Sequence, residues 1–225
     1  MAQNPVTKQQ KVVIPNKHGE KLVGVLHETG SKEIVIQCHG FTSNKENIIM
    51  VNLAVALEKE GITAFRFDFA GNGYGGSVVL LYASKYHDIG AVVNISGRYN
   101  IEGGVKERLG EDYMEGLKKD GFIDVKNKSG TVLYRVTMES VMDRLNTNMH
   151  EACLQIDKNC RVLTVHGTKD EINPVGDAIE FSKIIPNHEL HTIEGANHVY
   201  SSLQTELATA VLRFIKSTLQ DNKDK

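Results

Sequence analysis

Residues 33–69 read EIVIQCHGFTSNKENIIMVNLAVALEKEGITAFRFDF, and they contain two β-rich runs with a long apolar segment between them. The β-rich runs predict strands at residues 33–38 and 62–69, and the apolar segment predicts a helix at about residues 45–60. The S-x-x-E pattern at residues 43–46 matches a capping box, which predicts that the helix starts there. A strand, a helix and a strand in this order form a βαβ unit, so we expect the two strands to be parallel.

The alternation of strands and helices continues on both sides of this unit. An antiparallel hairpin is expected to open the sheet at residues 12–15 and 22–27, because turn-forming residues separate two β-rich runs. The other expected elements are helices at residues 77–86 and 202–219 and strands at residues 91–96, 161–166 and 190–194. Together they predict an α/β fold with a mostly parallel sheet flanked by helices.

Residues 97–159 interrupt the alternation and form an insertion between two expected strands. Its expected elements are a charged helix at about residues 105–119, a hairpin at residues 122–136 and a helical stretch at residues 139–156. We expect this insertion to be a lid or cap on an α/β core made of residues 1–96 and 160–225.

Composition narrows the class of protein. At 225 residues with 40% hydrophobic side chains, the chain is long enough for one α/β domain. The net charge is -2, from 26 basic and 28 acidic residues, so the chain has no excess of positive charge that would attract nucleic acid. We therefore expect a small-molecule partner and no nucleic acid.

Cysteine spacing and hydropathy indicate the compartment. The three cysteines, Cys38, Cys153 and Cys160, include no C-x-x-C pair, which argues against a disulfide framework and against a zinc site. Residues 1–10 are polar, and no stretch approaches the roughly 18 apolar residues of a membrane span. We expect a cytoplasmic protein with no membrane span, no metal and no cofactor.

Two motifs near the end of the chain carry residues typical of acid–base chemistry. His198 ends the sequence GANH at residues 195–198, just after an expected strand, and Asp170 lies upstream in HGTKDEINP at residues 166–174. A carboxylate can hold one nitrogen of an imidazole ring, so that the other nitrogen can take a proton from a nucleophile and pass it to a leaving group. The order and spacing of the two motifs suit such a pair.

With these motifs in this order, the chain resembles the α/β-hydrolase superfamily, and it looks most similar to plant cytosolic serine hydrolases of the esterase, lipase and aminopeptidase-like type. The resemblance covers about residues 11–217. It implies activity on carboxylic esters of small or lipid-like alcohols, with Asp170 as the orienting acid and His198 as the base.

The resemblance also implies roles around the pocket. Phe41, after the H-G of the first βαβ unit, would offer a backbone N–H to the developing oxyanion, and Tyr74 would offer the second. The residues implied to support the site are His39, Gly40, Asp68, Gly71 and Gly73.

A nucleophile is missing from this pattern. Where G-x-S-x-G would stand, residues 71–75 read GNGYG, so Gly73 takes the place of the serine. Members of the family have a further helix and the central strand before that serine, and here a few tens of residues are missing. We therefore expect a sheet without its central strand and impaired or absent catalysis. The sheet could close the gap left by the central strand in two ways. Residues 65–69 could move into the position of that strand, or the strand ending at Cys38 could pair directly with residues 91–95.

No other residue takes the place of the nucleophile in the sequence. Ser77 at a helix start is typical of a cap, Ser96 ends a strand with no elbow motif, and Cys38 is typical of a buried and inert strand cysteine. The nucleophile is therefore left unassigned.

Two alternatives to an esterase remain. The chain could be a non-catalytic relative that binds a small ligand or a protein partner. More remotely, GNGYGG at residues 71–76 also matches G-x-G-x-x-G, and Arg98 about 20 residues on could read a 2′-phosphate, which would indicate an NADP-binding oxidoreductase.

Overall fold

A computed structural model describes residues 8–69 and 75–223. Its strands are β1 (Lys8–Pro15), β2 (Lys21–Glu28), β3 (Ile34–Cys38), β4 (Thr63–Phe67), β5 (Ala91–Ile95), β6 (Phe122–Lys126), β7 (Val132–Thr137), β8 (Arg161–Gly167) and β9 (His188–Ile193). Its helices are α1 (Ile48–Lys59), α2 (Gly75–Tyr86), α3 (Ile101–Leu109), α4 (Tyr113–Asp120), α5 (Met138–Leu145), α6 (Met149–Leu154), α7 (Val175–Ile184) and α8 (Gln204–Lys223).

The strands form an α/β architecture with parallel pairing at its centre, as the sequence predicts. One sheet has the order β1-β2-β4-β3, in which β3 and β4 are parallel and the β1–β2 hairpin is antiparallel. A second sheet has the order β5-β8-β9 and is parallel throughout. A separate hairpin of β6 and β7 lies in the insertion.

The two larger sheets do not join into one. Among the strands that the structure describes, β3 pairs only with β4, and β5 pairs only with β8. Neither of the two ways expected for the sheet to close its gap is found. Strand β4 (residues 63–67) pairs between β2 and β3, and β3 does not pair with β5. Each of these two strands therefore presents one edge of N–H and C=O groups that no described strand satisfies.

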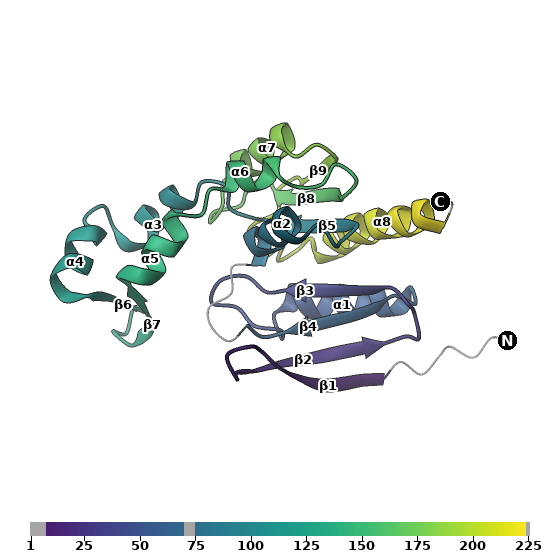
Figure 1. The fold of residues 1–225 in the computed structure, drawn as a ribbon, viewed down its shortest axis with the longest axis horizontal. Coiled ribbons are helices and arrows are strands. Elements are labelled where there is room, and N and C mark those ends of the chain that lie inside the picture. Colours follow the sequence, from purple (N-terminus) through teal and green to yellow (C-terminus); the bar gives the residue numbers. More distant parts are fainter. Residues whose placement is uncertain (1–7, 70–74, 224–225) are drawn as a thin grey trace.

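A layer of helices holds the two sheets together. Helix α1 packs on β4 and β2, α8 packs on β5, β8 and β9, and α1 and α8 pack on each other. Figure 1 shows these two helices on one side of the strands, with α2 on the other side of β5. One buried cluster runs through this layer, from Ala64 of β4 through Leu57 of α1 and Phe214 of α8 to Leu163 of β8. Side-chain packing replaces strand pairing as the connection between the sheets.

The face of the first sheet away from α1 is apolar and open. Side chains alternate across a strand, so Gln37 packs against α1 while Ile34 and Ile36 point the other way. These two isoleucines are 51% and 59% exposed, and Ile36 lies beside Phe65 of β4 in the parallel register. Figure 1 shows no helix across this face of β4, while helix α2 contacts β3 beside it. An apolar face beside an unpaired edge is a site for association.

We expect the protein to self-associate through this face, and the substitution Ile36→Lys to weaken the association. Losing the burial of one isoleucine, about 1.5–3 kcal/mol, corresponds to a dissociation constant roughly tenfold to hundredfold higher. Sedimentation velocity over a concentration series measures the change. Ile179→Lys is the control, because Ile179 is an exposed isoleucine on helix α7. A wild type that is monomeric at every concentration, or an equal effect of both substitutions, would contradict the expectation.

The insertion has a small core of its own. Helices α3, α4 and α5 pack with the β6–β7 hairpin around Val105, Tyr113, Leu117 and Val141. Figure 1 shows these elements projecting from the end of the sheets. Helix α6 is different, because it packs against α2 and α7 and buries Met149 in a cluster of the α/β core.

Several local expectations are wrong. Helix α1 begins at Ile48, and its N-cap is Asn47, whose side chain accepts from the backbone N–H of Ile49. Glu46 does not form a capping box because its carboxylate binds Arg66 of β4 at 2.7 Å. The two helical stretches expected in the insertion are each broken in two, and α7 is absent from the expected elements.

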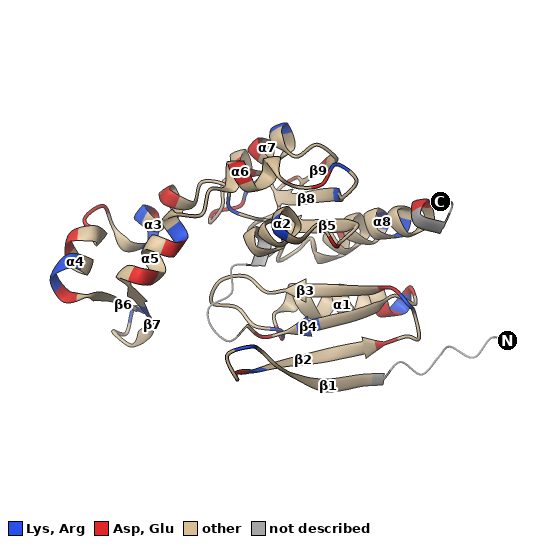
Figure 2. Cartoon of the chain, in the orientation of Figure 1, with Lys and Arg blue, Asp and Glu red and all other residues tan. Residues whose placement is uncertain are grey.

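The surface shows two further features. Basic and acidic residues are interspersed over the helices of both the core and the insertion (Figure 2). No helix in the described ranges is long and apolar enough to cross a membrane.

Candidate active site

Asp170 and His198 lie together at the carboxyl ends of two neighbouring strands. Asp170 follows β8 in the loop of residues 168–174, here called the acid loop, and His198 follows β9. The Oδ2 atom of Asp170 is 2.8 Å from the Nδ1 atom of His198. Because parallel strands end at the same edge of a sheet, two loops distant in sequence bring the carboxylate and the imidazole into contact.

The Asp170 carboxylate is buried and well bonded. Its Oδ1 atom accepts the backbone N–H groups of Ile172 at 2.9 Å and Asn173 at 2.8 Å. Burial acts to raise the pKa of Asp170, but the hydrogen bonds from His198 and from the two backbone N–H groups outweigh it, so the pKa lies below its usual value. An ionised Asp170 accepts the Nδ1–H of His198, which leaves the Nε2 atom with a lone pair to accept a proton.

No described hydroxyl or thiol forms a hydrogen bond with Nε2 of His198. The three side chains considered as nucleophiles are either bonded elsewhere or weakly nucleophilic. The Ser77 hydroxyl is buried and donates to the carbonyl of Arg98 at 3.2 Å. Burial raises the pKa of the Cys38 thiol to about 11, so it stays a weak nucleophile.

Ser96 lies in a strained turn that no motif in the sequence predicts. It follows β5 directly and has a φ of 51°, a left-handed conformation that is strained for serine. Its hydroxyl is buried and lies 2.8 Å from the hydroxyl of Tyr200, which in turn donates to the carbonyl of Val165. The turn therefore points the Ser96 hydroxyl into the core.

The loop after β3 is organised by His39. Its Nε2 atom accepts the backbone N–H of Phe69 at 3.1 Å, so Nδ1 carries the proton and donates to the carbonyl of Gly40 at 2.9 Å. The buried ring thus links the ends of β3 and β4 and shapes the backbone that leads into Phe41. Tyr74, Gly71 and Gly73 lie outside the described residues.

Asp68 supports the same loop and does not contact Asp170 or His198. Its carboxylate accepts the ammonium of Lys45 at 2.6 Å and the backbone N–H of Lys45 at 2.7 Å. Partial burial acts to raise the pKa of Asp68, but these two hydrogen bonds and the charge of Lys45 lower it below its usual value. Asp68 therefore ties the chain after β3 to the end of β4.

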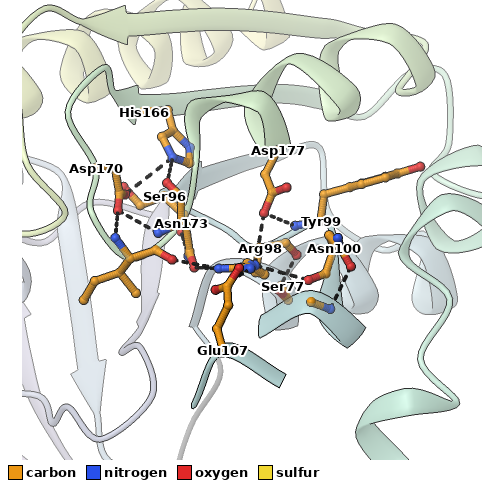
Figure 3. Close-up of polar contacts among 12 residues, drawn as sticks. Ser77, Ser96, Arg98, Tyr99, Asn100, Glu107, His166, Asp170, Asn173 and Asp177 are labelled. Atoms are coloured by element: carbon orange, nitrogen blue, oxygen red, sulfur yellow. Dashed lines mark hydrogen bonds and ion pairs between the residues drawn. The ribbon is translucent and has the colours of Figure 1, made fainter. Parts of the chain in front are cut away.

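The structure also places Arg98 beside the acid loop (Figure 3), where the sequence assigns it no role in an esterase. Its Nη1 atom donates to the carbonyl of Ile172 at 2.7 Å and to the side chain of Asn173 at 3.3 Å. The amide of Asn173 in turn donates to the carbonyl of Ser96 at 2.6 Å. The same backbone segment that binds Asp170 is therefore held from its other side.

Arg98 also connects the acid loop to the insertion and to α7. It donates to the carbonyl of Asn100 at 3.1 Å and to the carboxylate of Glu107 on α3 at 2.8 Å. Its Nε atom is 3.4 Å from the buried carboxylate of Asp177 on α7. Burial raises the pKa of Asp177 despite the opposing hydrogen bond from Tyr99 and the charge of Arg98. An isolated arginine after a strand is the only signal in the sequence for this arrangement.

The described part of the chain contains no group of side chains suited to binding a metal ion. Within residues 8–69 and 75–223, no cluster of three or more His, Cys, Asp or Glu side chains could hold a metal ion.

Comparison with known proteins shows a likeness of structure only. No protein-family model matches the chain, and no curated protein matches it. The esterase Est1E from Butyrivibrio proteoclasticus superposes with a TM-score of 0.75 at 20% identity, over 93% of this chain and 99% of that one. The Pyrococcus furiosus esterase Pf2001 gives 0.68 at 18% identity, over 94% and 90%. α/β-hydrolase domain-containing protein 10 from mouse gives 0.72 at 17% identity, over 93% and 99%. At such identities the likeness is one of fold: this chain has the fold of these esterases and α/β hydrolases.

Proposed function

We propose that this chain is a relative of the serine esterases that binds a small ester or lipid-like ligand but hydrolyses it poorly or not at all. One observation carries the proposal: Asp170 and His198 are 2.8 Å apart, while Nε2 of His198 has no described hydroxyl or thiol as a hydrogen-bond partner. In this proposal Asp170 and His198 are the acid and the base, and no described residue supplies the group that they would activate.

The chemistry of the pair explains why this loss is severe. The imidazole would take the proton of an attacking hydroxyl and later give it to the leaving alcohol, while Asp170 stabilises the imidazolium. Without an attacking group there is no acyl-enzyme and no proton to transfer. Loss of the serine in a well-studied serine protease lowers turnover roughly a millionfold, and the remaining catalysis comes from oxyanion binding and substrate binding.

In the same proposal the chain is a ligand-binding protein of the cytoplasm related to plant hydrolases. In this proposal residues 97–159 are a lid over a core of residues 1–96 and 160–225, and Phe41 contributes the backbone N–H that contacts a ligand carbonyl. The contact between the Phe41 and Tyr134 rings, with centroids 5.0 Å apart, supports the placement of the insertion over this loop.

An active esterase with an unrecognised nucleophile is the main alternative, and the esterases among the structural neighbours favour it. The oxidoreductase alternative is less well supported. Arg98, which would read a 2′-phosphate, is 7% exposed and already bound to Ile172, Asn100 and Glu107.

Treatment with a fluorophosphonate followed by intact-mass analysis tests the proposal. We expect no stoichiometric adduct on the folded chain, and hydrolysis of p-nitrophenyl esters no faster than that of the His198→Ala variant. A circular dichroism melt confirms that each protein is folded. A one-to-one adduct that forms in the wild type and is lost in His198→Ala would overturn the proposal, and peptide sequencing would identify the nucleophile.

A further inference from the structure

We propose that the insertion contains a binding site for a small aromatic anion, such as an aromatic carboxylate. The inference rests on the proposed ligand-binding function, because it names the chemical class of the ligand. Its basis is a cavity of about 230 Å³ between α3, β7 and α5, with Phe41 at one wall. This volume lies below the range of roughly 300–1,000 Å³ typical of drug-sized ligands, so the site suits a single ring with a short substituent.

The walls of the cavity are suited to a flat apolar group. The rings of Phe41 and Tyr134 meet edge to face, with an interplanar angle of 86°. Val105 of α3 and Val141 of α5 also line the cavity, and both side chains are buried in the core of the insertion. Aromatic and branched side chains of this kind contact both the edge and the face of a bound ring.

The polar part of the lining has one sign of charge. Arg108, Arg135 and Arg144 line the cavity, and none of the described residues that line it is an aspartate or glutamate. The Arg135 guanidinium binds Asp124 with two hydrogen bonds of 2.7 and 2.9 Å, so its charge is largely balanced. Arg108 on α3 adds a further positive charge, and Arg144 on α5 also lies in the lining. Figure 2 shows basic residues on both helices.

Arg108 is placed to bind an anion and an aromatic ring together. Its Cζ atom lies 4.3 Å from the centroid of the Phe41 ring. A guanidinium stacked on an aromatic face keeps its N–H donors in its own plane, where they can bind a carboxylate. Charge-assisted hydrogen bonds to a carboxylate are among the stronger ones in proteins. An anionic ligand is therefore preferred over a neutral one of the same shape.

The position of the cavity relates it to the candidate active site. Phe41 lines the cavity and also follows the loop that His39 holds between β3 and β4. A ligand with its anionic ring in the insertion would therefore direct its other end towards this loop. The ligand class that follows is an ester or acid with an aromatic carboxylate group.

Titration calorimetry with benzoate and with its neutral isostere benzamide tests the site. For the wild type we expect saturable binding of benzoate, about tenfold tighter than that of benzamide, because one charge-assisted contact is worth about this factor. The preference should shrink in about 1 M sodium chloride, where the Debye length falls to roughly 3 Å.

Variants identify the residues involved. Arg108→Gln and the double variant R108Q/R144Q should progressively remove the preference for benzoate, while leaving benzamide binding unchanged. Arg213→Gln is the matched control, because Arg213 is an exposed arginine on α8 that pairs with Glu189 outside the insertion. Arg108 is exposed, so its single substitution tests the site even where the double variant does not fold.

Three results would overturn the inference: no saturable binding of benzoate, equal affinity of the wild type for benzoate and benzamide, or a preference in Arg108→Gln as large as in the wild type. Failure of the proposed function gives a different result. A fluorophosphonate adduct would show an active hydrolase and leave the anion preference intact, whereas loss of the preference would leave the absence of hydrolysis intact.

Discussion

Replacing Arg98 by methionine is expected to lower the free energy of unfolding by about 3–5 kcal/mol, which is typical when one partner of a buried ion pair is removed. The substitution leaves the buried carboxylate of Asp177 without its cation and removes the donors to the carbonyls of Ile172 and Asn100. The acid loop would lose its support on the side opposite to His198. Urea unfolding followed by circular dichroism measures the change.

A matched control and a double variant show how much of the lost stability comes from the burial of the ion pair and how much from the unpaired charge of Asp177. Arg135→Met also breaks an arginine–carboxylate pair, with Asp124, but this pair lies on the surface and is expected to contribute less than about 1 kcal/mol. In the double variant R98M/D177N the unpaired charge is gone, so part of the lost stability should return. Equal losses for Arg98→Met and Arg135→Met would contradict the role of Arg98 as a buried connection.

Replacing Phe214 by alanine is expected to lower the free energy of unfolding by about 3–5 kcal/mol and to uncouple the two sheets. Phe214 is 2% exposed and lies in the helix layer that joins them. Because no described strand pairs β3 with β5, the loss of packing here has no hydrogen-bonded ladder to compensate for it. Unfolding should become broader, and tyrosine fluorescence and far-ultraviolet circular dichroism should no longer give the same transition.

Phe122→Ala provides the comparison for this prediction. Phe122 is 38% exposed on β6 in the insertion, where Arg135 stacks on its ring. The same chemical change there should lower stability by about 1 kcal/mol or less and leave a single transition. A sharp, coincident transition in Phe214→Ala would mean that the sheets do not depend on the helix layer for their connection.

Much of the fold follows from patterns within short segments. The β-rich runs and the apolar helix of residues 33–69 appear as β3, α1 and β4, because alternation and helical periodicity are properties of neighbouring residues. Helix boundaries are less predictable. Glu46 suits a capping box in the sequence, but Arg66, 20 residues away, binds its carboxylate instead.

The candidate site likewise has one part that the sequence predicts and another that it does not. The motifs that contain Asp170 and His198 follow strands, and the sequence alone therefore places both residues at one edge of the sheet. It also shows that Gly73 stands where a serine would be expected. The role of Arg98 cannot be deduced from its neighbours in the chain, because its partners Glu107 and Ile172 come from the insertion and from the acid loop.

The sequence by itself thus determined the α/β class, the pairing of an acid with a base, and the lack of a serine at the expected turn. Only the tertiary structure decided that the sheet is divided between β3 and β5, that Ile34 and Ile36 remain exposed, and that arginines line a cavity in the insertion. The physical reason is that periodicity is encoded locally, whereas strand pairing, burial and charge clustering depend on which distant segments meet.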